Sequence, residues 1–359
     1  MRVPAAFRLA LLVLVAGAAL AGCGGDEPPP RDVPLYSIED FLAGITYRGL
    51  SFSPGQDKIL VTSDASGVFN AFAVPLDGSE PVPLTHSETN AIFARAYFPA
   101  DERFVYTSDQ GGNERSHVYI QTPEGNAIDI TPGDGLAARF LGWARDDAGF
   151  YVATNERDGR FFDVYEYSPQ TYGRTLVYEN DEGLDFAAIS PDRRYIALTK
   201  DNTTNDSDIY LLDRESGETT LITPQEGEEV ANTPQEFDPE GTALYYLTDQ
   251  GHEFRYLVRY DLASGTTETV VQPEWDVRQA GFSKDGKRLV ASINNDARTE
   301  IQVYDHPGML RVALPDLPDA EITTVTYSRD GTHLAFYASS SRDPRDLFVV
   351  NGAGGAPVR

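Results

Sequence analysis

The sequence has little cysteine and histidine, and it lacks the motif of a serine nucleophile. Cys23 is the only cysteine among 359 residues, which excludes an internal disulfide and a cysteine-based metal cluster. The five histidines are isolated from one another along the chain, at His86, His117, His252, His306 and His333. No Gly-x-Ser-x-Gly occurs, the sharp turn that exposes the serine of an α/β-hydrolase. We therefore expect no catalytic residue, no metal site and no cofactor in this chain.

Long apolar runs are also scarce, and the one that exists lies at the N-terminus. Residues 9–20 are rich in Leu, Val and Ala, follow Arg2 and Arg8, and are too short to span a bilayer. A basic start, a short apolar stretch and small residues behind it are typical of a secretory signal peptide. Because Leu-Ala-Gly directly precedes Cys23, this segment resembles the lipobox of bacterial lipoproteins. The alternative is an ordinary signal peptide with a chance cysteine.

The N-terminus therefore predicts export and anchoring. We expect residues 1–22 to be a lipoprotein signal peptide and Cys23 to become the lipidated first residue. Residues 23–34 contain three consecutive prolines and are expected to form a lipid-anchored Pro/Gly tether. The predicted protein is a membrane-anchored lipoprotein that faces the periplasm or the cell surface and contacts the bilayer through Cys23 only.

Basic residues are few relative to acidic ones. The chain has 29 Lys and Arg against 56 Asp and Glu, which gives a formal net charge of −27. A field of this sign repels nucleic acid and anionic lipid, so we expect no nucleic-acid partner. The acidic residues are scattered and not gathered into tails, which favours a role in solubility.

The sequence is rich in one repeated pattern. An apolar residue followed by a turn of Ser, Pro, Asp or Gly type recurs at intervals of 45–48 residues, at Phe52, Phe98, Trp143, Ile189, Phe237, Phe282 and Tyr327. Each turn precedes a short strand rich in β-branched or aromatic residues, such as Ile59–Thr62, then a polar loop and a third strand, such as Val118–Gln121. A glycine turn and a more polar fourth strand end the unit. Four antiparallel strands in about 45 residues are typical of a propeller blade.

The sequence predicts an all-β fold for residues 35–359, a seven-bladed β-propeller of four-stranded antiparallel blades. The blades are expected near residues 47–90, 91–136, 137–183, 184–229, 230–275, 276–320 and 321–359. The last blade is short, because its fourth strand would begin only at residues 356–359. Either residues 35–47 complete its sheet, or a continuation is missing.

Several segments resemble the N-terminal β-propeller of prolyl oligopeptidase family serine peptidases, in particular the dipeptidyl- and acylaminoacyl-peptidase types. The resemblance covers residues 36–359 and rests on residues 36–41, the Ser-Pro-Gly-Gln turn at 53–56, and residues 155–165 and 248–254. In that family, catalysis belongs to an α/β-hydrolase domain that follows the propeller, and no residue here matches its motif.

The resemblance thus implies the substrate-gating domain alone, a cap that sieves peptides, from a truncated or split member. The chain would be part of a serine peptidase only if a C-terminal hydrolase domain exists, for example one encoded downstream. The implied ligand is a peptide or protein at the propeller face or channel.

Two other classes of protein share the blade pattern. A TolB-like propeller would be a protein-interaction scaffold of the cell envelope, but TolB places an α/β domain before its propeller and residues 24–47 are too few for one. A propeller enzyme such as a lactonase or a sugar dehydrogenase would need a calcium or quinone site, and the scattered histidines argue against it.

Four arginines are the main candidates for binding. Arg48, Arg139 and Arg278 each stand four residues before the apolar anchor of their blade, and Arg95 stands three before. These positions open the innermost strands, so the four side chains are expected to form a positive mouth around the channel. Such a ring could bind peptide carboxylates or an acidic partner segment. The alternative is that each arginine pairs with a neighbouring carboxylate.

Two acidic segments are weaker candidates. Paired glutamates bind the substrate's free N-terminus in the dipeptidyl peptidases that the sequence resembles, and Glu228 and Glu229 are the one such pair here. They lack the family's surrounding pattern, so a solvated loop is the alternative. Residues 201–208 form an oxygen-rich segment, yet it carries Asp206 where an EF-hand needs glycine and Leu212 where it needs a carboxylate. We expect a solvated hairpin loop there.

Overall fold

The computed structural model describes residues 35–225, 227, 229–314, 317–351 and 355–359. The chain divides into two compact units, Met1–Gly44 and Ile45–Arg359. The described part of the first contains the short helix α2 (Ile38–Leu42). A capping box starts this helix: the Asp40 N–H donates to the Ser37 hydroxyl (3.2 Å), and the Ser37 N–H donates to the Asp40 carboxylate (2.8 Å). No helix within the described residues is long and apolar enough to cross a membrane.

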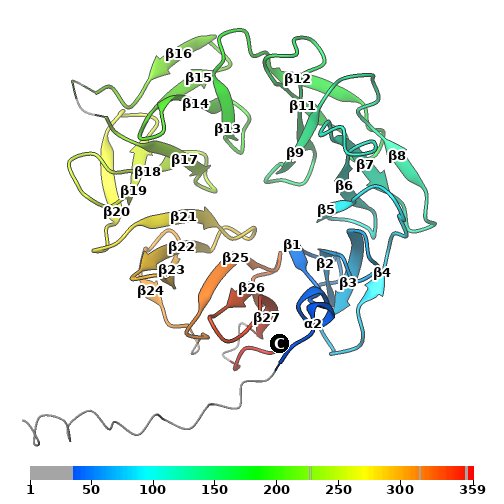
Figure 1. The fold of residues 1–359 in the computed structure, drawn as a ribbon. Coiled ribbons are helices and arrows are strands. Elements are labelled where there is room, and N and C mark those ends of the chain that lie inside the picture. Colours follow the sequence, from blue (N-terminus) through cyan, green and yellow to red (C-terminus); the bar gives the residue numbers. More distant parts are fainter. Residues whose placement is uncertain (1–34, 226, 228, 315–316, 352–354) are drawn as a thin grey trace, which may run out of the picture. The chain divides into compact units, whose positions relative to one another are not determined.

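The second unit is a ring of seven antiparallel sheets around a central channel (Figure 1). The strands of blades 1 to 4 are β1 (Tyr47–Phe52), β2 (Lys58–Ser63), β3 (Asn70–Pro75) and β4 (Val82–Pro83); β5 (Phe93–Tyr97), β6 (Phe104–Ser108), β7 (His117–Gln121) and β8 (Ala127–Asp129); β9 (Ala138–Trp143), β10 (Phe150–Thr154), β11 (Asp163–Tyr167) and β12 (Arg174–Tyr178); and β13 (Asp185–Ile189), β14 (Tyr195–Thr203), β15 (Asp206–Asp213) and β16 (Glu218–Leu221). Those of blades 5 to 7 are β17 (Asn232–Phe237), β18 (Ala243–Thr248), β19 (Tyr256–Asp261) and β20 (Thr267–Val271); β21 (Val277–Phe282), β22 (Arg288–Asn295), β23 (Arg298–Asp305) and β24 (Arg311–Val312); and β25 (Glu321–Tyr327), β26 (His333–Ser339) and β27 (Asp346–Asn351). The predicted seven-bladed propeller is confirmed.

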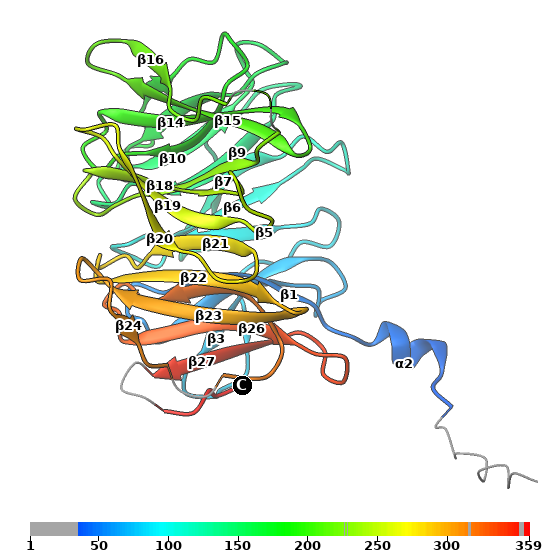
Figure 2. The same ribbon diagram turned by 90° about the vertical axis from the view of Figure 1, so that its left-hand side faces the viewer.

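Each blade is a consecutive run of the chain, and its first strand lies nearest the channel (Figure 1). Figure 2 shows the ring from the side, where the strands run from one face of the ring to the other. Because every blade repeats the same order, the seven innermost strands run in the same direction along the channel. Each of them carries a register shift against its neighbour, at the positions that face the channel. Such bulges twist the strand and re-aim its side chains.

The repeated turn after each innermost strand has a physical reason. In blade 4, the buried Ser190 hydroxyl donates to Asp192 (2.5 Å) and accepts from the Tyr195 N–H (2.8 Å), which ties the turn to the start of the next strand. Blades 6 and 7 repeat this pattern through Ser283 and Ser328. The Ser-x-Asp motif is therefore a device that closes the inner hairpin, because its hydroxyl satisfies polar groups that are buried between blades.

The core consists of separate apolar layers between neighbouring blades. The layer between blades 2 and 3 is built around Phe98, Phe150 and Tyr167, each no more than 1% exposed. Rings pack edge-on there, with Phe98 and Trp143 centroids 5.0 Å apart. Since the two faces of an inner strand contribute to two neighbouring layers, as Phe150 and Tyr151 of β10 do, the inner strands are nearly continuous apolar runs in the sequence.

The last blade contacts the first through side chains and not through a shared sheet. Phe52, Ile59 and Val61 of blade 1 pack against Ala335 and Leu347 of blade 7. The Tyr337 hydroxyl donates to the Gly49 carbonyl (2.7 Å) across the same boundary.

The described strands of the last blade are β25, β26 and β27, all within residues 321–351. Tyr47 belongs to β1, and the outer edge of β27 is covered by residues near the C-terminus. The bridge there joins Val349 and Val358, with N–H to carbonyl distances of 2.9 and 2.8 Å.

Candidate binding site in the central channel

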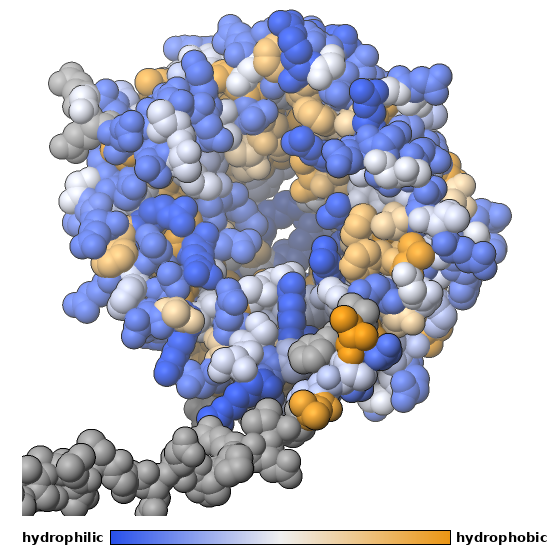
Figure 3. Space-filling model, in the orientation of Figure 1, coloured by the Kyte–Doolittle hydropathy of each residue, from blue (hydrophilic) through white to orange (hydrophobic). Residues whose placement is uncertain are grey.

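The innermost strands of blades 3 to 7 line a cavity of about 730 Å³. Figure 3 shows that the ring is hollow at its centre. The lining is mixed: Leu141 and Phe186 are apolar, whereas Gln235, Gln279 and Thr323 offer amide and hydroxyl groups. A cavity of this size is within the range of about 300–1,000 Å³ that holds small ligands.

The four predicted arginines lie where the sequence placed them, at the second or third residue of an innermost strand. Arg48 is on β1, Arg95 on β5, Arg139 on β9 and Arg278 on β21, and all four are exposed. Because the innermost strands run in one direction, these residues lie toward one end of the channel. Of the four, Arg278 lines the cavity itself.

Two of these arginines stack on aromatic rings of their own blades. The guanidinium carbon of Arg48 lies 5.0 Å from the Phe69 ring centre, and that of Arg139 lies 4.1 Å from the Phe162 ring centre. Stacking of this kind fixes the guanidinium plane while leaving its N–H groups at the edge free to bind an anion.

The other two arginines make polar contacts. Arg95 donates from Nε to the Thr107 hydroxyl (3.0 Å), and desolvation by the surrounding protein lowers its pKa, although solvent still reaches the side chain. Arg278 pairs with Glu321 of the next blade at 3.5 Å. Among the described residues it is the one arginine of the four with a carboxylate within ion-pair distance, so pairing with neighbouring acids does not account for the set.

Of the remaining sequence candidates, Cys23 and Glu228 lie outside the described residues. Glu229 is exposed in the segment before β17 and does not line the cavity.

The oxygen-rich segment is mostly strand and not loop. β14 and β15 pair along it, leaving residues 204–205 as the turn, and Asn202 donates to Asp208 (2.9 Å). The hairpin is confirmed, but the expected loop is too long, because ladder hydrogen bonds outweigh the low strand propensity of Asp and Asn. Side chains alternate between the faces of a strand, which separates these oxygens. Within the described residues, no group of three or more His, Cys, Asp or Glu could hold a metal ion.

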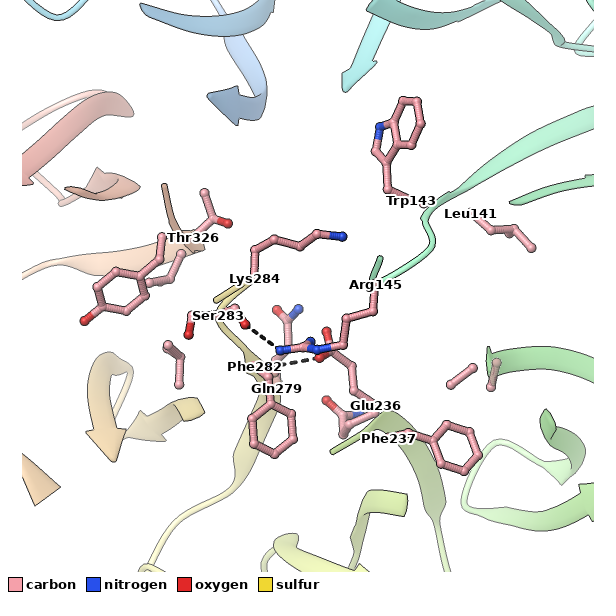
Figure 4. Close-up of a pocket in the computed structure, with 18 of the residues that line it drawn as sticks. Leu141, Trp143, Arg145, Glu236, Phe237, Gln279, Phe282, Ser283, Lys284 and Thr326 are labelled. Carbon is pink, nitrogen blue, oxygen red and sulfur yellow. Dashed lines mark hydrogen bonds between the residues drawn. The ribbon is translucent and has the colours of Figure 1, made fainter. Parts of the chain in front are cut away.

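The sequence analysis missed a set of contacts across the other end of the channel. Arg145, in the inner turn of blade 3, donates to the Ser283 carbonyl (2.9 Å), and Lys284, in that of blade 6, donates to the Ala144 carbonyl (2.8 Å). Each cation thus binds the carbonyl of the residue that precedes the other. Figure 4 shows the two side chains extending toward each other from opposite walls. We call these two residues with Asp147 the clasp.

Asp147 extends the clasp to a third blade. Its carboxylate lies 2.7 Å from Lys284 Nζ and 2.5 Å from a guanidinium nitrogen of Arg329 in blade 7. Burial lowers the pKa of Lys284, an effect that the hydrogen bond to Asp147 opposes. Asp147 has a φ of 60°, a left-handed conformation that an L-residue holds at a cost. Blades 6 and 7 have glycine at the equivalent position, Gly286 and Gly331.

Glu236 of β17 is a second carboxylate at this end of the cavity. It accepts a hydrogen bond from the Phe282 N–H (3.0 Å) and so links blade 5 to blade 6 (Figure 4). Burial raises its pKa, and Arg145 and Lys284 act in the opposite direction. The clasped end therefore combines three cations with two carboxylates, one of which is desolvated. This arrangement is suited to binding anionic groups.

Fold and cavity together define a seven-bladed β-propeller with an axial binding cavity, closed by packing between its first and last blades. A sequence model of the N-terminal β-propeller domain of prolyl oligopeptidase matches residues 86–357. The chain belongs to this family, and the resemblance found in the sequence is confirmed.

Known relatives place the propeller within larger proteins. Dipeptidyl aminopeptidase BIII of Pseudoxanthomonas mexicana is 28% identical over 284 residues, which are 76% of this chain and 40% of that protein. A prolyl endopeptidase structure superposes with a TM-score of 0.65 at 14% identity, over 88% of this chain and 49% of its own. The chain thus spans less than half the length of either protein.

A solved structure of another kind shares the fold. An oligogalacturonate lyase in complex with manganese gives a TM-score of 0.64 at 13% identity, over 86% of this chain and 90% of its own. At this identity the likeness concerns the fold alone.

Proposed function

We propose that this chain is the substrate-gating propeller of a prolyl oligopeptidase-type serine peptidase, that it carries no catalytic residues itself, and that it is anchored to the cell envelope through Cys23. Membership of the prolyl oligopeptidase propeller family is the observation that carries this proposal. In this role the ring binds peptides in its channel and limits by size and charge which of them reach an active site.

The cavity supports this role. Its volume suits a short peptide, its lining mixes amide and apolar groups, and arginines stand at one end of it. On a chain with a net charge of −27, such local positive charge favours acidic groups or a carboxyl terminus over other ligands.

The hydrolase would be a domain of the same polypeptide in its cellular form or a separately encoded chain. We would capture the endogenous protein from the membrane fraction of its source with an antibody against the propeller, and label the captured material with a fluorophosphonate, which reacts with activated serines. We expect one labelled band, either the antibody-reactive chain itself or a co-captured partner.

Capture without any labelled serine hydrolase would contradict the peptidase role. The proteins captured instead would then test the TolB-like alternative, a scaffold that binds envelope proteins. Labelling must disappear after heat denaturation, which is the control for non-specific reaction of the probe.

A further inference from the structure

Cations from three blades gather at the clasped end of the channel. Arg145, Lys284 and Arg329 lie there with Asp147 and Glu236, and the charge of Arg145 also acts on Glu240 of blade 5. Asp147 pairs with Lys284 and Arg329, whereas Arg145 has no carboxylate within ion-pair distance among the described residues.

Arg145 has guanidinium N–H groups that its described contacts do not use. A guanidinium carries five N–H groups in a fixed planar fork. In the described contacts Arg145 uses one of them, for the Ser283 carbonyl, and it forms no ion pair within 4 Å. Arg193, which stands in the inner turn of blade 4, is by contrast bonded to both Asp146 and Glu166. Unlike Arg193, Arg145 therefore keeps N–H groups that its described contacts do not use.

These cations face the cavity. Arg145 and Lys284 both line it, as do Glu236 and the apolar residues Leu141 and Phe186. Figure 4 shows Arg145 and Lys284 among the side chains that line the cavity. A ligand in the cavity can therefore reach them, and the clasp holds them in place before it arrives, which reduces the entropy lost on binding.

We propose that the clasped end of the channel binds the carboxylate of a small ligand, the C-terminal carboxylate of a short peptide, with Arg145 as the principal donor and Lys284 as the second cation. Arg145 offers the planar pair of N–H groups that a carboxylate accepts side by side. The amides of Gln235 and Gln279 along the wall match the polar backbone of a peptide, and the apolar wall accepts its side chains. The site goes beyond the gating role, since it would bind peptides whether or not a hydrolase domain is present.

The cavity contains its own reporter. Trp143 lines it, and Trp275 is the only other tryptophan. In a Trp275→Phe background, the emission of Trp143 can be titrated with trialanine and with trialanine amide, which differ only in the C-terminal charge. We expect trialanine to bind. The dissociation constant of the amide should be higher by at least about tenfold, as the loss of a charge-assisted hydrogen bond predicts.

Arg145→Gln should also weaken the binding of trialanine about tenfold, because it removes the charge while keeping a polar side chain. The matched control is Arg214→Gln: Arg214 likewise donates to one carbonyl, that of Arg193 (2.8 Å), but it does not line the cavity. Equal binding of the acid and the amide, no binding of either, or undiminished binding by the Arg145 variant would each overturn the proposal.

Inorganic phosphate and acetate can be compared as competitors of trialanine. If phosphate competes as well as acetate does, the site binds anions in general, and this result would also overturn the proposal. Because the peptide comparison uses the unaltered clasp, the result does not depend on whether the Arg145 variant folds. A failed hydrolase capture would leave this result unaffected.

Discussion

Asp147 offers the most direct test of how the ring is held together, because its carboxylate contacts side chains of two other blades. Its carboxylate pairs with Lys284 and Arg329, and the three side chains are between 25% and 32% exposed. Exposed ion pairs contribute at most about 1 kcal/mol, whereas removing one partner of a buried pair costs about 3–5 kcal/mol. At this intermediate burial, Asp147→Asn should destabilise the protein by about 2 kcal/mol. Two cations would then lie close together without their shared partner.

Asp147→Gly separates the ion pairs from the backbone conformation. Glycine removes the same charge but adopts the φ of 60° without strain, which is worth about 1 kcal/mol relative to another residue. The glycine variant should therefore lose only about half as much stability as the asparagine variant. Gln56→Gly is the matched control: Gln56 has a φ of 58° in the equivalent turn of blade 1, where it accepts only from the Asp330 N–H (3.2 Å). It should be neutral or slightly stabilising.

Thermal unfolding followed by circular dichroism is the assay, since the melting temperature of a domain this large falls by about 2 °C per kcal/mol. The difference between wild type and Asp147→Asn should shrink in about 1 M NaCl, where the Debye length is about 3 Å. An asparagine variant as stable as wild type, or a glycine variant less stable than the asparagine variant, would refute the reasoning.

Three further predictions concern other parts of the chain. Cys23→Ala should abolish incorporation of a labelled fatty acid and move the protein from the membrane to the soluble fraction, and retention in the membrane would contradict the lipid anchor. Charge reversal at Arg48 and Arg139 together should weaken binding of acidic peptides by at least tenfold with little change in melting temperature, and intact binding would exclude the positive mouth. Stability should fall from about pH 5 toward pH 2: hydrogen bonds from Arg160 lower the pKa of Asp158 to about 2, and those from Arg193 lower the pKa of Asp146. The unfolded chain takes up protons first as the pH drops, so a denaturation midpoint that rose on acidification would have the wrong sign.

The fold could be predicted almost completely from the sequence because its units repeat. Each apolar anchor ends an innermost strand and is followed by a turn, so the same pattern predicts the position of all seven blades. The positions of Arg48 and Arg278 followed from the same spacing, since counting back from an anchor gives the start of an innermost strand.

The clasp could not be predicted in this way. Arg145 and Ser283 are 138 residues apart in the chain, and their contact depends on the width of the closed ring and on side-chain conformation. A signal did exist in the repeat itself. The turns of blades 6 and 7 have glycine where blade 3 has Asp147, and a non-glycine residue at a left-handed position usually has a reason to be there.

The junction between blades 7 and 1 makes this ring independent of where its chain is cut. All strand pairing among the described residues lies within single blades, and the junction contains side chains such as Phe52 and Ala335 and the hydrogen bond from Tyr337 to Gly49. If the ring were opened at any other junction and joined at this one, no ladder would be broken or exchanged. In topological terms the propeller is a cyclic array of seven consecutive blades, in which a circular permutant should form the same ring.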